Sequence, residues 1–262
     1  HKSPFHGFSA EFSEHKVYNS GESTKHMDWK LYAKTDRLYT KRYEEETNLR
    51  CHIIIDNSSS MHYPKLSSGQ LFYENKIGFS VLASAVLMNI LKKQRDAVGL
   101  SVFSDSYEYY APEKGSDRHH RMLLNVLENL LENQTPKKTT DTVTYLHQIA
   151  EKMHRRSMIL LFTDMFQSDE VSSSEEKLFA ALQHLKHNKH KVVLFHVMDY
   201  KTELNFDFDS APRRFVDLES GEEIAVFADT IKESYEKKMQ DYFEKVAMTC
   251  AQNKIKYIPV SV

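Results

Sequence analysis

The stretch CHIIIDNSSSMH, residues 51–62, decides the fold that we expect for this chain. Its first part, Cys51 to Ile55, is short, mostly β-branched and without polar alternation, which is typical of a strand buried on both faces of a parallel sheet. The strand runs directly into Asp56, followed by an asparagine and three serines, with no glycine or proline to shape a turn. A buried strand therefore delivers one carboxylate and several hydroxyl groups to its carboxyl end.

The rest of the chain alternates between strand and helix patterns. Strands are predicted over residues 51–55, 98–104, 107–112, 157–164, 191–199 and 255–260, and helices over residues 75–95, 116–133, 142–155, 172–187 and 229–252. This alternation predicts an α/β, Rossmann-like fold, with about six strands in a mostly parallel sheet and helices on both faces. We expect residues 107–112 to form an edge strand and residues 51–55 to lie inside the sheet.

Two regions interrupt the alternation and define the predicted domains. Residues 1–49 are polar and aromatic and lack a long helix pattern. They are expected to pack on a core domain formed by residues 50–262, with Trp29 and Tyr32 attaching them to it. Residues 199–227 contain two short strand patterns around a Ser-Gly pair, which indicates an inserted hairpin.

Composition excludes several classes of protein. The 262 residues carry 35 Lys and Arg against 37 Asp and Glu, a net charge of −2, which argues against a broad nucleic-acid-binding surface. The two cysteines, Cys51 and Cys250, cannot form a disulfide framework or a zinc motif, which favours a reducing, cytoplasmic setting. No apolar run is long enough to insert into a membrane, and no signal peptide is visible. Because the chain begins with His1 rather than Met, we expect it to be a segment of a longer protein.

Oxygen-bearing side chains follow two of the predicted strands and precede one helix. Open α/β sheets bind ligands outside the carboxyl ends of their strands, where the strand order reverses. Such oxygens suit Mg²⁺ best, with Mn²⁺ or Ca²⁺ as alternatives, rather than Zn²⁺. The candidate metal ligands are Asp56, Ser58, Ser60, Thr140 and Asp164. No Walker loop or Gly-x-Gly-x-x-Gly turn is present to cradle a phosphate.

This ligand pattern resembles the metal-ion-dependent adhesion site of von Willebrand factor A-like domains. In that family a metal is held by Asp-x-Ser-x-Ser after the first strand, by a Thr in a later loop and by an Asp after a further strand. The five candidate ligands match those positions. The chain departs from the family at Ser59, Thr139 and Met165, each of which stands where glycine is frequent. The resemblance implies a von Willebrand factor A-like fold for residues 50–262.

A second resemblance covers nearly the whole chain. Residues 18–46, YNSGESTKHMDWKLYAKTDRLYTKRYEEE, together with FHVMD and FVDLESGEE further along, are similar to the bacterial family called domain of unknown function 58. The matching positions are Tyr18, Gly21 and Glu22, then Met27, Asp28 and Trp29, then residues 41–45. This resemblance implies a partner, a MoxR-type AAA+ ATPase, and a role in the assembly or maturation of other proteins.

These features favour a non-enzymatic, metal-dependent protein-interaction module. Two acids and three neutral hydroxyls leave a divalent ion electrophilic, so that a partner could complete its coordination with a carboxylate. One alternative is a metal-dependent hydrolase of phosphate esters. For this hydrolase the sequence shows no nucleophile elbow, and Asp141 is the only candidate general base near the metal ligands. The other alternative is a structural domain with a vestigial metal site.

Other polar clusters are interpreted as structural. His184, His187 and His190 in HLKHNKH could share a metal, but a basic, solvated helix end is the favoured interpretation. The same solvated placement is expected for the adjacent pair His119 and His120. The stretch NFDFD, residues 205–209, lacks the glycine and the terminal glutamate of an EF-hand and is expected to be a loop.

Overall fold

The computed structural model divides the chain into two compact units, His1–Asn48 and Leu49–Val262. Each unit is described by itself. The residues that the structure describes are 11–19, 24, 27–44, 49–66, 68–104, 107–132, 142–153, 156–165, 179–180, 183, 189–208, 212–216 and 223–262.

The first unit is built from two strands and one short helix. Strand β1 (Glu11–Val17) pairs antiparallel with β2 (Tyr39–Glu44), and helix α1 (Trp29–Thr35) lies between them in sequence. Within this unit the side chains of Trp29 and Tyr32 are 62% and 38% exposed. Their attachment to the core stays a prediction.

Asp28 connects all three elements of the first unit. Its Oδ1 accepts hydrogen bonds from the backbone N–H groups of Lys30 and Leu31, both at 3.0 Å, and so caps α1. Its Oδ2 lies 2.9 Å from His15 Nε2 on β1 and 3.3 Å from Lys41 Nζ on β2. The hydrogen bond with His15, followed by that from the Leu31 N–H, holds the pKa of Asp28 well below its usual range.

We predict that Asp28→Ala opens the first unit, because it removes the helix cap and the ionic contacts together. Amide hydrogen exchange should become faster across α1 and β2. Asp28→Asn is the matched control: asparagine also caps helices, so exchange in the first turn of α1 should stay slow although the charge is lost. Equal acceleration in both variants would show that the charge, not the cap, holds the unit.

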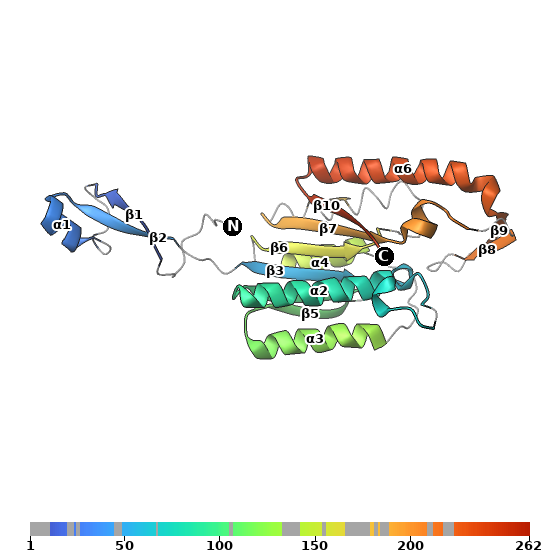
Figure 1. Ribbon diagram of the computed structural model, residues 1–262, viewed down its shortest axis with the longest axis horizontal. Helices are drawn as coiled ribbons and strands as arrows, with labels where there is room; N and C mark the ends of the chain where they lie inside the picture. The colour runs from blue at the N-terminus through green and yellow to red at the C-terminus, as the bar shows by residue number, and fades with distance from the viewer. Residues whose placement is uncertain are drawn as a thin grey trace. The chain divides into compact units, whose positions relative to one another are not determined.

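The second unit contains a six-stranded sheet in the order β10-β7-β6-β3-β4-β5 (Figure 1). All neighbouring strands run parallel except β5, which is antiparallel to β4 at one edge. The predicted α/β fold with a mostly parallel sheet is confirmed, with β3 inside the sheet as expected. The strands are β3 (Arg50–Asp56), β4 (Ala97–Phe103), β5 (Tyr107–Lys114), β6 (Met158–Thr163), β7 (Lys191–Met198) and β10 (Lys256–Ser261).

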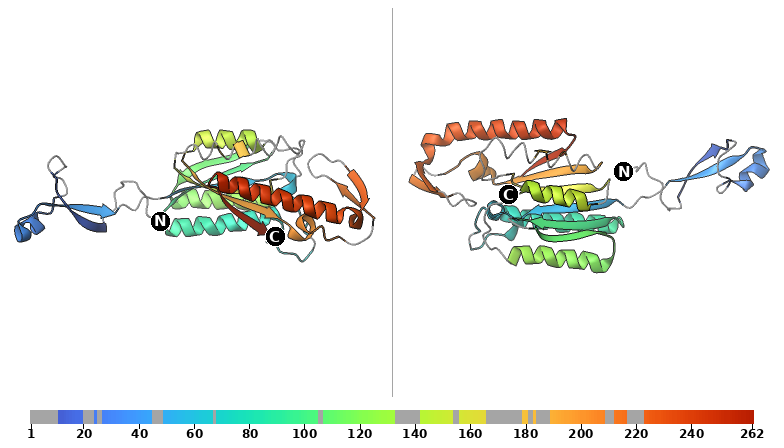
Figure 2. Two further views of the ribbon diagram at one scale, coloured as in Figure 1. Left: turned by 90° about the horizontal axis from the view of Figure 1, so that it is seen from above. Right: turned by 180° about the vertical axis from the view of Figure 1, so that it is seen from behind.

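Helices lie on both faces of the sheet (Figures 1 and 2). They are α2 (Lys76–Lys93), α3 (Asp117–Glu132), α4 (Thr142–Lys152) and α6 (Ala228–Gln252). Alternate residues of β3 contribute to two different buried clusters. Ile53 and Ile55 belong to a buried cluster with side chains of α2 and α3, whereas Ile54 belongs to a second cluster with side chains of α4 and α6. This burial on both faces explains the unbroken apolar run of the strand.

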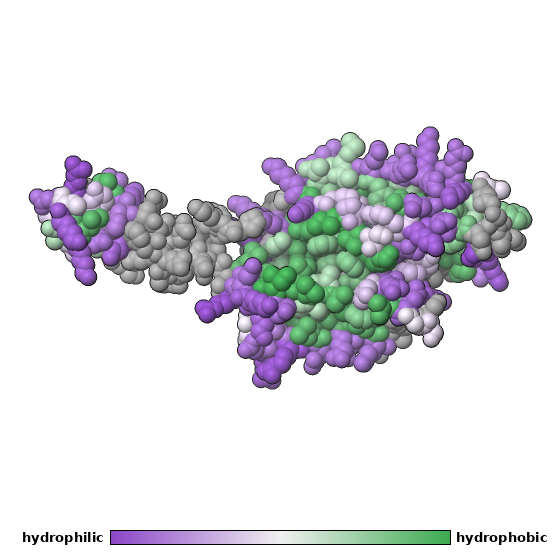
Figure 3. Space-filling model, in the orientation of Figure 1, coloured by the Kyte–Doolittle hydropathy of each residue, from purple (hydrophilic) through white to green (hydrophobic). Residues whose placement is uncertain are grey.

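Part of the α2 side of the second unit is apolar at its surface (Figure 3). On α2 itself, Leu82, Val86 and Ile90 recur at four-residue spacing, and their side chains are 38%, 52% and 46% exposed. Spacing of four places these residues on one outward stripe of the helix. Among the described residues, no helix combines the length and the apolar character needed to cross a membrane.

The region after β7 departs from the sheet. A single turn of π-helix, η4 (Tyr200–Leu204), is followed by β8 (Pro212–Val216) and β9 (Glu223–Phe227), which pair antiparallel. Phe206 stacks on Phe215 of β8 at 5.3 Å between ring centroids and contacts Tyr235 of α6 at 4.5 Å. Most of the helix predicted over residues 172–187 lies outside the described residues.

Candidate metal centre

The loop after β3 gathers one carboxylate and two hydroxyl groups. Asp56 Oδ1 accepts a hydrogen bond from the backbone N–H of Ser58 at 2.9 Å, which turns the chain immediately after the strand. The hydroxyl oxygens of Ser58 and Ser60 lie 3.0 Å apart. Ser59 begins a short 3₁₀ helix, η2 (Ser59–His62). The chain turns through this helix without a glycine or a proline.

Strand β6 brings a second carboxylate to the same edge of the sheet. Strand β3 pairs with β6 on one side and β4 on the other, so its carboxyl end lies where the strand order reverses. The Thr163 hydroxyl, at the end of β6, donates to Asp56 Oδ2 at 2.7 Å. Asp164 follows directly and is completely buried. Thr140 and Asp141 lie outside the described residues.

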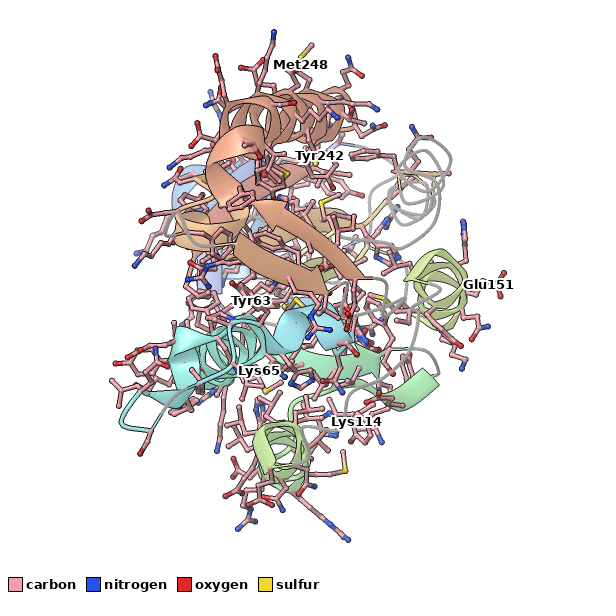
Figure 4. All side chains as sticks on the ribbon, turned by 90° about the vertical axis from the view of Figure 1, so that its right-hand side faces the viewer. Tyr63, Lys65, Lys114, Glu151, Tyr242 and Met248 are labelled. Atoms are coloured by element: carbon pink, nitrogen blue, oxygen red, sulfur yellow. The ribbon has the colours of Figure 1, made fainter. Side chains whose placement is uncertain are left out.

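A buried lysine contacts the second carboxylate. The side chain of Lys76, the first residue of α2, is completely buried. Its Nζ lies 2.8 Å from Asp164 Oδ2 and 2.6 Å from Glu203 Oε1, and 5.8 Å from the centre of the Tyr63 ring. Figure 4 looks onto this edge of the sheet and labels Tyr63, whose hydroxyl donates to Thr202 Oγ1 at 2.7 Å.

The electrostatics of the site favour additional positive charge. Burial, and then the negative charge of Asp164, raise the pKa of Asp56 to about 7, against the opposing hydrogen bonds from Thr163 and Ser58. Burial lowers the pKa of Lys76, but the charges of Asp164 and Glu203 outweigh it and leave that pKa above its usual value. Burial likewise raises the pKa of Glu203. The ammonium of Lys76 contacts two of these carboxylates, those of Asp164 and Glu203.

The donor set fits a hard divalent cation on the Asp56 side of the site. Carboxylate and hydroxyl oxygens are the ligands that Mg²⁺, Mn²⁺ and Ca²⁺ prefer, and those of Asp56, Ser58 and Ser60 come from one loop. On the other side, an ammonium group already contacts Asp164. Within the described ranges no group of three or more His, Cys, Asp or Glu could hold a metal.

Comparison with known proteins settles the family. The sequence profile described as "Protein of unknown function DUF58" matches residues 14–245. The chain belongs to this family. The resemblance drawn from the residues between Tyr18 and Glu46 is therefore confirmed. No curated protein matches the chain in sequence.

Several solved structures are similar to this DUF58 chain at low sequence identity. The conserved hypothetical protein BatB from Bacteroides thetaiotaomicron is 14% identical, with a TM-score of 0.49 over 81% of this chain and 90% of its own. Manganese-loaded TRAP protein from Plasmodium vivax is 18% identical, with a TM-score of 0.42 over 56% of each chain. The SpRpn10 VWA domain is 14% identical, with a TM-score of 0.35 over 58% of this chain and 77% of its own.

A neutral histidine, His196, contacts the backbone of the candidate metal centre at Asp164. His196 Nε2 lies 2.9 Å from the Asp164 carbonyl oxygen, and its Nδ1 lies 2.8 Å from the Tyr257 hydroxyl. The carbonyl can only accept, so Nε2 carries the proton and Nδ1 accepts from the tyrosine. Burial lowers the pKa of His196 to about 4. The residue therefore fixes the chain after β6 without adding charge.

The prediction that His119, His120 and His190 are solvated is wrong. All three side chains are buried. His119 and His120 are among the buried residues of α3, with Leu123, Leu127 and Leu130. His119 Nε2 lies 3.0 Å from the Val98 carbonyl oxygen, and His190 Nδ1 accepts from the Ser157 N–H at 3.0 Å. His119 and His190 therefore serve as structural hydrogen-bonding groups. His184 and His187 lie outside the described residues.

A second buried polar cluster has the composition of a hydrolase triad. His52 Nε2 lies 2.6 Å from Ser101 Oγ, and His52 Nδ1 lies 2.8 Å from Glu113 Oε1. Ser101 and His52 are completely buried, and the Tyr110 ring stacks on His52 at 5.4 Å. A substrate has no path to a serine in this position, so the cluster satisfies buried polar groups inside the sheet.

Three residues of the site escaped prediction from the sequence. Thr163 had a usable signal, since it directly precedes a candidate ligand at the end of a strand. Lys76 had a weaker signal: a lysine that opens an otherwise apolar helix after the capping residue Asn75. Glu203 had none, because only the tertiary fold brings η4 to Lys76.

Proposed function

We propose that this DUF58 chain is a non-enzymatic protein-interaction module whose binding depends on a divalent cation. The observation that carries the proposal is the gathering of Asp56, Ser58, Ser60 and Asp164 at the carboxyl edge of the sheet, where open α/β folds bind their ligands. The donors are oxygens, and the buried Asp56 carboxyl has a raised pKa because burial and the charge of Asp164 disfavour its ionised form. Both properties favour a hard cation.

In this proposal the ion is Mg²⁺, with Mn²⁺ or Ca²⁺ as alternatives. The residues that would hold it are Asp56, Ser58, Ser60 and Thr140, with Asp164 beside it. When bound, the ion supplies an electrophilic position that accepts a carboxylate from a protein partner. Family membership supports a MoxR-type AAA+ ATPase as that partner, in the assembly or maturation of other proteins. The free, buried cysteines Cys51 and Cys250 are in keeping with a cytoplasmic location.

We predict that Asp56→Ala abolishes metal binding with little loss of stability. The variant loses the hydrogen bonds from Ser58 and Thr163, each worth about 1 kcal/mol, but it also relieves the burial of a charge close to Asp164. In EDTA its melting temperature should lie close to that of the wild type. At about 100 times Kd, a metal should stabilise the wild type by roughly 2.7 kcal/mol, and Asp56→Ala not at all.

Asp241→Ala is the matched control, because Asp241 is an exposed carboxylate on α6. It should keep the full metal-dependent rise in melting temperature. The interaction itself is tested with the wild-type chain and the purified MoxR-type ATPase from the same genome. Binding should occur in Mg²⁺ and disappear both in EDTA and with Asp56→Ala. Binding that survives both changes would overturn the metal-dependent mechanism.

The hydrolase alternative is tested with the same variant. Wild-type protein should turn over generic phosphate esters in Mg²⁺ or Mn²⁺ no faster than the metal alone. Turnover well above that control, lost in Asp56→Ala, would replace the interaction module by an enzyme. Absence of any metal-dependent change in wild-type melting temperature would favour the structural domain with a vestigial site.

A further inference from the structure

The buried ammonium of Lys76 occupies one side of the proposed metal site. Buried lysines are rare unless their charge is paired. Here two carboxylates from different elements converge on Nζ, that of Asp164 at 2.8 Å and that of Glu203 at 2.6 Å. A completely buried side chain held by two short ion pairs has little freedom to leave.

Glu203 holds the ammonium from the side of η4. Its Oε2 accepts from the Asp199 N–H at 2.8 Å, and its backbone carbonyl accepts from the Tyr235 hydroxyl of α6 at 2.8 Å. Both the side chain and the backbone of Glu203 are therefore fixed. Lys76 stays beside Asp164 because the far side of its ammonium is anchored.

We propose that Lys76 is a resident cation that competes with the divalent ion for Asp164 and so sets the metal affinity of this site. An ammonium on Asp164 Oδ2 withdraws electron density from that carboxylate and repels a second cation beside it. A bound ion would then be held mainly by the Asp56 loop. This inference rests on the proposed function only in placing the metal at the same edge of the sheet.

The test compares Lys76→Met with wild type by calorimetric titration of the purified chain with MnCl₂ and MgCl₂. Methionine keeps the length of the side chain and removes its charge. We expect Lys76→Met to bind the metal roughly tenfold more tightly, or better. Lys245→Met, which removes an exposed lysine of α6, should bind it as the wild type does.

A double-mutant cycle separates competition for Asp164 from a general effect of charge. In the wild-type background, Asp164→Asn should weaken metal binding little, because the carboxylate is already engaged. In the Lys76→Met background the same change should remove most of the gain. Additive effects of the two substitutions would overturn the inference.

A double variant controls for misfolding and for the change in net charge. Lys76→Met combined with Glu203→Gln removes one positive and one negative charge, and it still frees Asp164. It should also bind metal more tightly than wild type, with an unchanged far-UV circular dichroism spectrum. Equal or weaker binding by this folded variant would contradict the competition.

The outcomes distinguish this inference from the proposed function. If wild type binds metal and the lysine variants bind it no better, the resident-cation role is wrong and the metal-dependent module stands. If only the lysine variants bind, Lys76 replaces the metal in the natural protein, and the metal-dependent module is wrong. If none of them binds, both are wrong.

Discussion

Replacing Lys76 by methionine is expected to lower the free energy of unfolding of the metal-free protein by about 3–5 kcal/mol. The substitution leaves Asp164, which is completely buried, and Glu203, which is mostly buried, without the ammonium that both contact. Removing one partner of a buried ion pair costs far more than the pair itself contributes, because the remaining charge keeps its desolvation penalty. The measurement is urea unfolding in EDTA near pH 7.

Two further variants test this explanation. Lys245→Met should change stability by less than about 0.5 kcal/mol, because Lys245 is exposed. Lys76→Met with Glu203→Gln should recover part of the loss, since it leaves one uncompensated carboxylate rather than two. A loss below about 1 kcal/mol in Lys76→Met would show that its ion pairs do not form in solution.

Gly78→Ala is expected to destabilise the second unit by about 3 kcal/mol, near the upper end for overpacking, and to lower the melting temperature by roughly 6–12 °C. A Cβ at this position would overlap the backbone carbonyl oxygen of Phe72 and would lie 2.8 Å from Asn75 Oδ1. The Gly78 N–H also donates to that Asn75 oxygen, which caps α2. An added methyl group must therefore move the backbone before α2 and disturb the placement of Lys76.

Gly115→Ala is the matched control, because a Cβ there would meet only the Asp96 carbonyl oxygen at an ordinary 3.8 Å. It should change the melting temperature little. Differential scanning fluorimetry on the two variants makes the comparison. Equal melting temperatures of Gly78→Ala and Gly115→Ala would show that the backbone before α2 shifts without a loss of stability.

The fold was predictable because its signals are local. A strand buried on both faces must be apolar throughout, and residues 51–55 meet that condition before any tertiary information is available. Alternation with helices then requires crossover connections and a mostly parallel sheet. The burial of His119, His120 and His190 was not predictable in this way. Their polarity suggests solvent, and only the packed structure shows that all three side chains are buried and that His119 and His190 each contact a backbone group.

The residues of the candidate metal centre also divide into those that the sequence could place and those that it could not. Asp56, Ser58 and Ser60 come from one loop, so their proximity follows from the sequence alone. Asp164 could be placed beside them because parallel strands share a carboxyl edge. Lys76 and Glu203 could not, since their contact depends on where α2 begins and on how η4 turns after β7. Metal binding by the Asp56 loop stays a prediction, and so does the role of Thr140 as a metal ligand.

The last strand of the sheet carries a built-in protection against aggregation. The N–H of Val262 donates to the Met198 carbonyl of β7 at 3.0 Å, so alternate residues of β10 direct their N–H groups toward β7 and the others away from it. Pro259 belongs to the second set and has no N–H to offer. Proline at such a position denies an incoming strand one bond of a regular ladder. An unrelated chain cannot extend this sheet in register beyond β10 without leaving a carbonyl of its own unpaired.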